Sequence, residues 1–412
     1  MADIRWTGEG VATAQVDTFT PANVEVDDIF TLTIAGLDGT STSISFTATA
    51  ATVANVTAGL TTAWNASTHA LCTPITASDQ TTYMDLTADT AGVAFYVTSS
   101  ATDGGGTDDQ TLTRAVGTAN GGPQDWSDAN NWDSGSVPGG AASQDVYIDF
   151  ATEEIIYGLD QSGISNTLNS LNIGQSFTGK IGYNGATGYS GTYLQIKSTT
   201  VNIGQHNGSG SPTGSTRLMI NTGSTASTIN IYNSASTSAD SNKPAIRLLA
   251  NSASTVINVN KGAVGVAYES GESATVGTIR QSYVNNQSTD ASSYISDGVT
   301  LTTLYKTGGT CELECGATTV TNDFGSIKTT GSGAITTFNH NGGTATLNST
   351  GTITTLNALG GLVDMTKDQK AKTVTTLKLD NSGQFKYDPS VVTLTNKIVP
   401  YDTTGEKTVT II

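Results

Sequence analysis

The chain has few basic residues and no long apolar segment, and both shortages narrow its possible partners. Lysine and arginine number 18 against 35 aspartates and glutamates, so the net charge over 412 residues is −17. A surface this poor in cations neither neutralises phosphates nor binds anionic lipid well, so we expect no nucleic acid partner. No segment reaches about 18 consecutive apolar residues, so we expect no insertion into a membrane.

Cysteine is also scarce, with only Cys72, Cys311 and Cys315 in the chain. On an extended strand, Cys311 and Cys315 would lie about 13 Å apart, which is too far for a disulfide unless the chain bends between them. We expect free or buried thiols. A metal site would need further ligands, and the nearest histidine in sequence is His340.

Motifs of catalysis are missing as well. His69, His206 and His340 flank no Gly-x-Ser-x-Gly elbow and no His-Glu-x-x-His pair. His206 opens a Gly/Ser-rich loop and His340 follows Asn339, so we interpret them as a solvated and a turn residue. The glycine runs lack the strand-turn-helix context of nucleotide-binding loops. We therefore predict no catalytic residue, no cofactor, no metal and no enzyme activity.

Paired carboxylates are the remaining catalytic candidates to weigh, because enzymes that cleave glycans use two of them. Glu312 and Glu314 would project from one strand face about 7 Å apart, a spacing that suits an inverting pair. Because only Tyr305 lies beside them to hold a sugar ring, we interpret them as a solvated strand face. The other candidates are Glu269 with Glu272, and Asp323.

The chain does contain a repeat, a four-residue phrase with two central residues between apolar or small ends. The copies begin 16 to 21 residues apart and are Leu301-Thr-Thr-Leu304, Ala317-Thr-Thr-Val320, Ile335-Thr-Thr-Phe338, Ile353-Thr-Thr-Leu356, Val374-Thr-Thr-Leu377 and Val391-Val-Thr-Leu394. A unit this short cannot bury its own apolar face and must stack on its copies. Glycine pairs at 308–309, 342–343 and 360–361 would form the corners, since glycine adopts positive φ.

A longer repeat of 28 to 30 residues precedes the short one. Its copies share an apolar-Asn-apolar centre and lie at 170–175, 200–205, 228–233 and 256–261, with Gly/Ser/Asn-rich loops such as 206–214 between them. Asn202, Asn230 and Asn258 would stack from copy to copy. They would form an internal hydrogen-bonded ladder, or they would point outward and be solvated.

These patterns predict a mainly β protein. Residues 1–118 do not repeat, and their alternating segments at 30–34 and 44–48, followed by a helical pattern at 53–64, predict a small α+β domain with one helix on a mainly antiparallel sheet. The remainder predicts a right-handed parallel β-helix, or β-solenoid, with long coils in residues 151–290 and short coils in residues 291–412. We expect residues 119–150 to form a linker that contains tryptophans and caps the solenoid.

The linker carries Trp126 and Trp132, followed by a Val-Pro-Gly turn at 137–139. It resembles a lead-in motif that precedes β-solenoids in bacterial surface and phage proteins. Bulky aromatics can close the open end of a stacked core, so we interpret both tryptophans as a cap. The alternative is that they stack on a glycan. Asp125, Asp128 and Asp133 do not have the spacing of a known calcium loop.

The N-terminal segment resembles a small module of phage virion and tail-associated proteins. The resemblance rests on DIFTLTIAG (28–36), SISFTATA (43–50), VANVTAGLTTAWN (53–65) and LTADTAGVAFYVT (86–98). It implies a structural role in attachment, spacing or decoration. The residues at 1–6 contain no apolar export segment, which fits a protein made in a host cytoplasm for a virion.

The expected function is therefore a non-enzymatic bacteriophage structural protein. We expect a capsid decoration (cement) or head-fibre protein that forms a homotrimer on the major capsid protein or another virion protein. One alternative is a tail fibre or spike that binds a host glycan. Another is a cellular surface adhesin.

Overall fold

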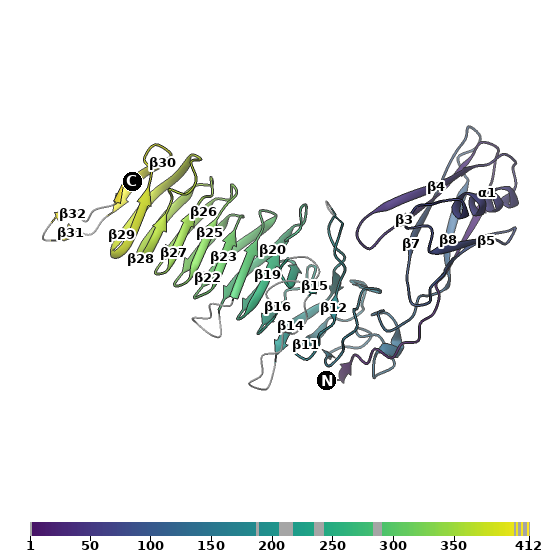
Figure 1. Ribbon diagram of the computed structural model, residues 1–412, viewed down its shortest axis with the longest axis horizontal. Helices are drawn as coiled ribbons and strands as arrows, with labels where there is room; N and C mark the ends of the chain where they lie inside the picture. The colour runs from purple at the N-terminus through teal and green to yellow at the C-terminus, as the bar shows by residue number, and fades with distance from the viewer. Residues whose placement is uncertain are drawn as a thin grey trace.

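The computed structural model describes residues 2–186, 189–205, 217–234, 243–282, 291–398, 401–402, 405–406 and 410–411. The chain is mainly β, with a small antiparallel module near the N-terminus and a large system of parallel strands after it (Figure 1). Each part has its own cluster of buried apolar side chains. The loop that contains His206 lies outside the described residues.

The module consists of seven strands and one helix. They are β2 (Val16–Ala22), β3 (Ile29–Ala35), β4 (Ser41–Thr47), α1 (Val53–Asn65), β5 (Ile75–Asp79), β6 (Met84–Ala88), β7 (Tyr96–Thr102) and β8 (Thr111–Thr118). The strands form two antiparallel sheets, ordered β5-β6-β2-β8 and β4-β3-β7, where the sequence had suggested one.

The predicted helix is confirmed. Thr52 caps its first turn by accepting a hydrogen bond from the backbone of Asn55, and Val56, Leu60 and Trp64 are buried. The Trp64 indole also donates to the carbonyl of Ile75, 3.0 Å away, which ties the end of α1 to β5. The apolar stripe that identified the helix is therefore the face that builds the module core.

The first strand of the chain does not belong to the module. β1 (Ala2–Arg5) pairs in parallel with β9 (Gln144–Ile148), which in turn pairs with β11 (Leu168–Gly174). The predicted domain of residues 1–118 thus includes a strand that lies in the parallel system. The module is an insertion between β1 and the linker, so the chain enters and leaves it at neighbouring points.

The parallel strands form two long rows in which a strand pairs with the next strand but one. The first row contains β14 (Ser198–Gln205), β16 (Thr228–Ile231), β18 (Asn251–Val259), β20 (Ala274–Gln281), β22 (Val299–Lys306), β24 (Ala317–Asn322) and β26 (Ile335–His340). The second contains β15 (Arg217–Asn221), β17 (Ile246–Leu249), β19 (Gly262–Val266), β21 (Ala291–Ile295), β23 (Thr310–Leu313), β25 (Ser326–Thr329) and β27 (Thr344–Leu347).

Three further strands continue the parallel pairing toward the C-terminus, and the first two are longer than those before them. β28 (Ile353–Asp364) pairs with both β26 and β27, and β29 (Lys372–Tyr387) and β30 (Val392–Ile398) follow it. Short elements complete the list: η1 (Ala129–Asn131), β10 (Asp160–Gln161), β12 (Lys180–Ile181), β13 (Leu194–Ile196), β31 (Tyr401–Asp402), β32 (Gly405–Glu406) and β33 (Thr410–Ile411).

The alignment of residues between paired parallel strands explains the short repeat of the sequence. Thr303, Thr319, Thr337, Thr355 and Thr376 are aligned partners in neighbouring strands, while the apolar or small ends of the first five phrases are buried. The sixth copy departs from this register, because Val374 pairs with Leu394 rather than with Val391. The second glycine of each pair has positive φ, and a Cβ added at Gly343 would lie 2.1 Å from the Gly325 carbonyl oxygen.

The asparagines of the long repeat form a hydrogen-bonded ladder. Asn202 donates to Asn172, Asn230 to Asn202 and Asn258 to Asn230, over distances of 2.8, 2.9 and 2.8 Å. The ladder is nevertheless on the outer side of the strands, since the residues on either side of each asparagine are buried while the asparagines are half-buried. The structure thus combines the two predicted alternatives, an outward position and a continuous chain of amides.

We expect Asn230→Leu to lower the free energy of unfolding by about 1–2 kcal/mol. The change leaves the carbonyl of Asn202 without its donor and the amide of Asn258 without its acceptor. Urea denaturation followed by circular dichroism measures the effect. Thr318→Leu, at an exposed position of β24, is the matched control and should change little; equal stability of the two variants would contradict a contribution from the ladder.

Candidate junction site

The module contacts the parallel strands through the turn between β3 and β4. The backbone N–H of Ala186 donates to the Asp38 carbonyl (2.8 Å), and the Thr192 hydroxyl donates to the Leu37 carbonyl (2.7 Å). Tyr183 and Thr192 exchange two backbone hydrogen bonds, which close the loop that holds this turn. The contact therefore fixes the module against a loop from the start of the parallel system.

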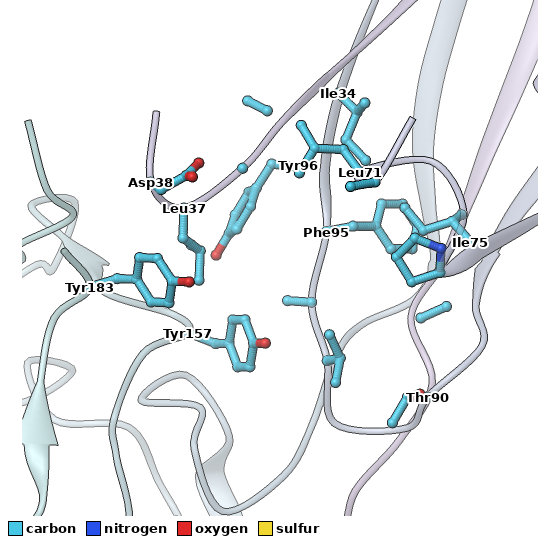
Figure 2. A pocket seen from close by; sticks show the side chains of 17 residues that line it. Ile34, Leu37, Asp38, Leu71, Ile75, Thr90, Phe95, Tyr96, Tyr157 and Tyr183 are labelled. Atoms are coloured by element: carbon cyan, nitrogen blue, oxygen red, sulfur yellow. The ribbon is translucent and has the colours of Figure 1, made fainter. Parts of the chain in front are cut away.

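A pocket of about 280 Å³ lies at this junction. Figure 2 shows Tyr96, Tyr157 and Tyr183 gathered around the side chain of Leu37, with Asp38 at the edge. Tyr96 comes from the module, and the other two tyrosines come from the parallel part. The floor is apolar and is formed by Ile34, Leu71, Pro74, Ile75, Val93 and Phe95.

The polar groups of the pocket have defined protonation states. The hydroxyl and backbone N–H of Thr40 donate to Asp38, and the hydroxyl bond is the main reason that the pKa of this carboxyl lies below its usual value. Burial raises the pKa of the Tyr96 and Tyr157 phenols. Near neutral pH Asp38 is thus a carboxylate, and Tyr96 and Tyr157 are neutral hydroxyls that both donate and accept.

A second hollow of about 380 Å³ shares Asp38 and Tyr183 with the first. It contains Glu154, which receives Lys180 at 2.7 Å and Arg217 at 3.5 Å. The two hollows together offer aromatic rings, an apolar floor and charged groups of both signs. Such a combination suits a ligand with one apolar face and several hydroxyls, as a sugar ring has.

The predicted aromatic residues Trp126 and Trp132 lie elsewhere and are buried. Their ring centroids are 4.8 Å apart, and Trp6 packs against both at 6.3 and 4.9 Å. All three belong to the core of the parallel strands, at its first strands. Their burial leaves no indole face for a sugar ring, so the structure does not support the glycan alternative at these positions. Trp6 was missed because it is far from the linker in sequence.

Three aspartates of the linker, Asp125, Asp128 and Asp133, accept hydrogen bonds from neighbouring backbone and side-chain groups. Asp125 accepts from Asn120 and Ser127, Asp128 from Gly122, and Asp133 from the backbone of Arg5. Across the described ranges, no group of three or more His, Cys, Asp or Glu side chains is placed to bind a metal ion. These aspartates fix the linker turns that position the two tryptophans.

Asp125 leads to a pH-dependent prediction. Burial raises its pKa above the unfolded value of 3.8, so its contribution to stability is fully present below pH 3.8 and is lost as the pH rises through the folded pKa. Asp125→Asn removes this loss, so we expect the variant to gain stability relative to the native chain between pH 4 and pH 7. Urea titrations across this range measure the difference, and parallel curves for the two proteins would contradict it.

The candidate catalytic carboxylates bind other side chains, and within one pair Glu272 also accepts from the backbone N–H of Glu269. Glu312 binds Lys328 at 2.7 Å, whereas Glu314 accepts from the Tyr294 hydroxyl at 2.6 Å. Asp323 accepts from Asn341, and Glu272 accepts from the Tyr193 hydroxyl at 3.0 Å. The aromatic beside the Glu312 pair is thus Tyr294 of β21, in the same row, rather than Tyr305 of the opposite row.

The prediction for the cysteines agrees with the structure, whereas the prediction for His340 does not. Cys311 and Cys315 are free and buried as expected, and burial raises the pKa of both to about 12; Cys72 is also free and buried. The turn interpretation of His340 is wrong, because this residue ends β26 and is fully buried. His69 is exposed, and its ring accepts a hydrogen bond from the backbone of Leu71.

Comparison with known proteins found no match to a protein family, a curated protein or a solved structure. In the part of the chain that the structure describes, no helix has the length and apolar character to cross a membrane.

Proposed function

We propose that this chain is a non-enzymatic structural protein of a bacteriophage particle, in which the parallel strands form a right-handed β-solenoid that carries the module. The observation that supports it best is the parallel pairing of each strand with the next strand but one, repeated from β14 to β27. Right-handed crossings are the rule for parallel strands in one sheet. A long element of this kind suits a spacer or fibre.

The polar residues on the outer side of the first row of strands fit the role of a spacer or fibre. Stacked asparagines and threonines on the first row present uncharged polar groups with repeated hydrogen bonds, for example Asn357 to Asn339 at 2.7 Å. The module, held at one end by its junction, is then the natural attachment unit. We propose a capsid decoration or head-fibre protein that is a homotrimer and binds the major capsid protein or another virion protein.

Purified particles and the isolated chain together test this proposal. Mass spectrometry of particles from the source phage should detect the chain, and an electron cryomicroscopy reconstruction should place it on the head. Light scattering should give about three times the 42.2 kDa of one chain. Absence of the chain from purified particles would overturn the virion assignment, and a monomeric mass would overturn the homotrimer.

The junction pocket favours a second candidate, a tail fibre or spike that binds a host glycan. Its support is the set of three tyrosines and Asp38 around an apolar floor. A glycan array with the native chain, repeated with Tyr157→Ala, tests it; Tyr305→Ala, on an exposed tyrosine outside the junction, is the control. Glycan binding that is lost in Tyr157→Ala and kept in Tyr305→Ala would support the tail-fibre candidate. No binding of the native chain to any glycan on the array would contradict it.

A further inference from the structure

A column of fully buried polar side chains runs along the ends of the first-row strands. Gln281, Lys306, Asn322 and His340 are successive register partners in β20, β22, β24 and β26. Polar groups in such positions need partners, and a lysine ammonium in particular is rarely buried without a carboxylate. The column is not explained by the stacking of the apolar core.

Lys306 has two hydrogen-bond acceptors within the described residues, and both are neutral. Its Nζ lies 3.2 Å from Oδ1 of Asn322 and 2.7 Å from the carbonyl oxygen of Phe324. Burial lowers the pKa of Lys306 to about 8, so a minor but reactive fraction of this side chain is a free amine near neutral pH. A desolvated amine of this kind is a nucleophile.

Asn322 presents its amide to that amine from the neighbouring strand. Its Nδ2 donates to the Gly342 carbonyl (2.9 Å) and lies 3.2 Å from Nδ1 of His340. The carbonyl end of the amide therefore faces Lys306, while the nitrogen end faces the imidazole. Both partners are fully buried, so water does not compete with the amine for the amide carbon.

We propose that Lys306 and Asn322 join in an intramolecular isopeptide bond. Nζ attacks Cγ of Asn322, a new Nζ–Cγ bond forms, and the Cγ–Nδ2 bond breaks. The proton that Nζ loses is transferred to Nδ2, which leaves as ammonia. The reaction exchanges one amide for another and needs no oxidant or reductant.

His340 is placed to transfer that proton. With Asn322 as donor, Nδ1 of His340 is the unprotonated nitrogen, and burial lowers the pKa of the ring so that it stays neutral. Nδ1 can take the proton from the tetrahedral intermediate and return it to the departing Nδ2. The bond would tie β22 to β24 and close the chain between two consecutive turns of the stack, as a disulfide does elsewhere.

Mass spectrometry of the intact native chain tests the bond directly. The expected mass is lower than the sequence mass by one ammonia, and the full sequence mass would overturn the proposal. Because a succinimide at an asparagine also loses ammonia, peptides must locate the change. Trypsin cannot cleave after an acylated Lys306, so one peptide spanning 281–328 should replace the peptides 281–306 and 307–328.

A second digestion separates the cross-link from a missed cleavage. Cleavage after Glu312 and Glu314 cuts the 281–328 peptide between the two residues, and the fragments should remain joined only if the isopeptide bond is present. Lys306→Met and Asn322→Leu should both restore the expected mass for their sequences. His340→Gln should lower the cross-linked fraction early after synthesis. Separate fragments from the native chain would overturn the proposal, as would persistence of the ammonia loss in Lys306→Met.

Discussion

Replacing Trp126 with alanine is expected to lower the free energy of unfolding by about 3–5 kcal/mol. The indole is fully buried and packs on the rings of Trp6 and Trp132, while its backbone carbonyl accepts a hydrogen bond from the Trp132 indole at 3.0 Å. The truncation leaves a cavity at the first strands of the parallel system. Urea denaturation followed by far-ultraviolet circular dichroism measures the loss without depending on tryptophan fluorescence.

Trp64→Ala is the matched control, because it truncates the same side chain in the other core. Trp64 lies in α1 and its indole binds β5 of the module, so its truncation should destabilise the module and leave the parallel strands folded. Trp126→Ala should have the opposite pattern, with hydrogen exchange increasing in β9 and β11. A Trp126→Ala protein as stable as the native chain would show that these tryptophans do not close the core.

The repeats could be predicted from sequence because periodic burial leaves a periodic pattern. Leu304, Val320, Phe338 and Leu356 are aligned in the structure at the spacing that the phrase gave. The ladder of Asn202, Asn230 and Asn258 was visible for the same reason. The register of the last copy could not be predicted, because β29 is a strand of 16 residues and its pairing with β30 does not follow from the four-residue phrase alone.

The junction pocket could not be predicted from the sequence, because its residues do not belong to a repeat. Tyr96, Tyr157 and Tyr183 meet only because β1 pairs with β9 and the module is inserted between them, a long-range pairing that no local motif records. The buried column of Lys306, Asn322 and His340 was hidden for a different reason. Each residue is separated from the next by one complete repeat, and each repeat carries a different polar residue at that position.

Replacing Glu269 with alanine is expected to lower the free energy of unfolding by about 3–5 kcal/mol, because it leaves a buried cation without its partner. Arg247 is fully buried in β17 and contacts Glu269 at 2.8 Å, and Lys243 contacts the same carboxylate oxygen at 2.7 Å. Glu312→Ala is the control, since its pair with Lys328 is partly exposed to solvent and should contribute no more than about 1 kcal/mol. Urea denaturation of the two variants measures the difference.

A double variant separates the cost of the unpaired cation from the value of the pair. Arg247→Met with Glu269→Leu removes both charges, so most of the stability lost in Glu269→Ala should return. Arg247 also donates to Asn184, in the loop that holds the module at Asp38 and Leu37. If the arginine positions this loop, the double variant should regain stability yet expose the loop to proteolysis. A double variant as unstable as Glu269→Ala would mean that the packing of these side chains, rather than their charge, determines the loss.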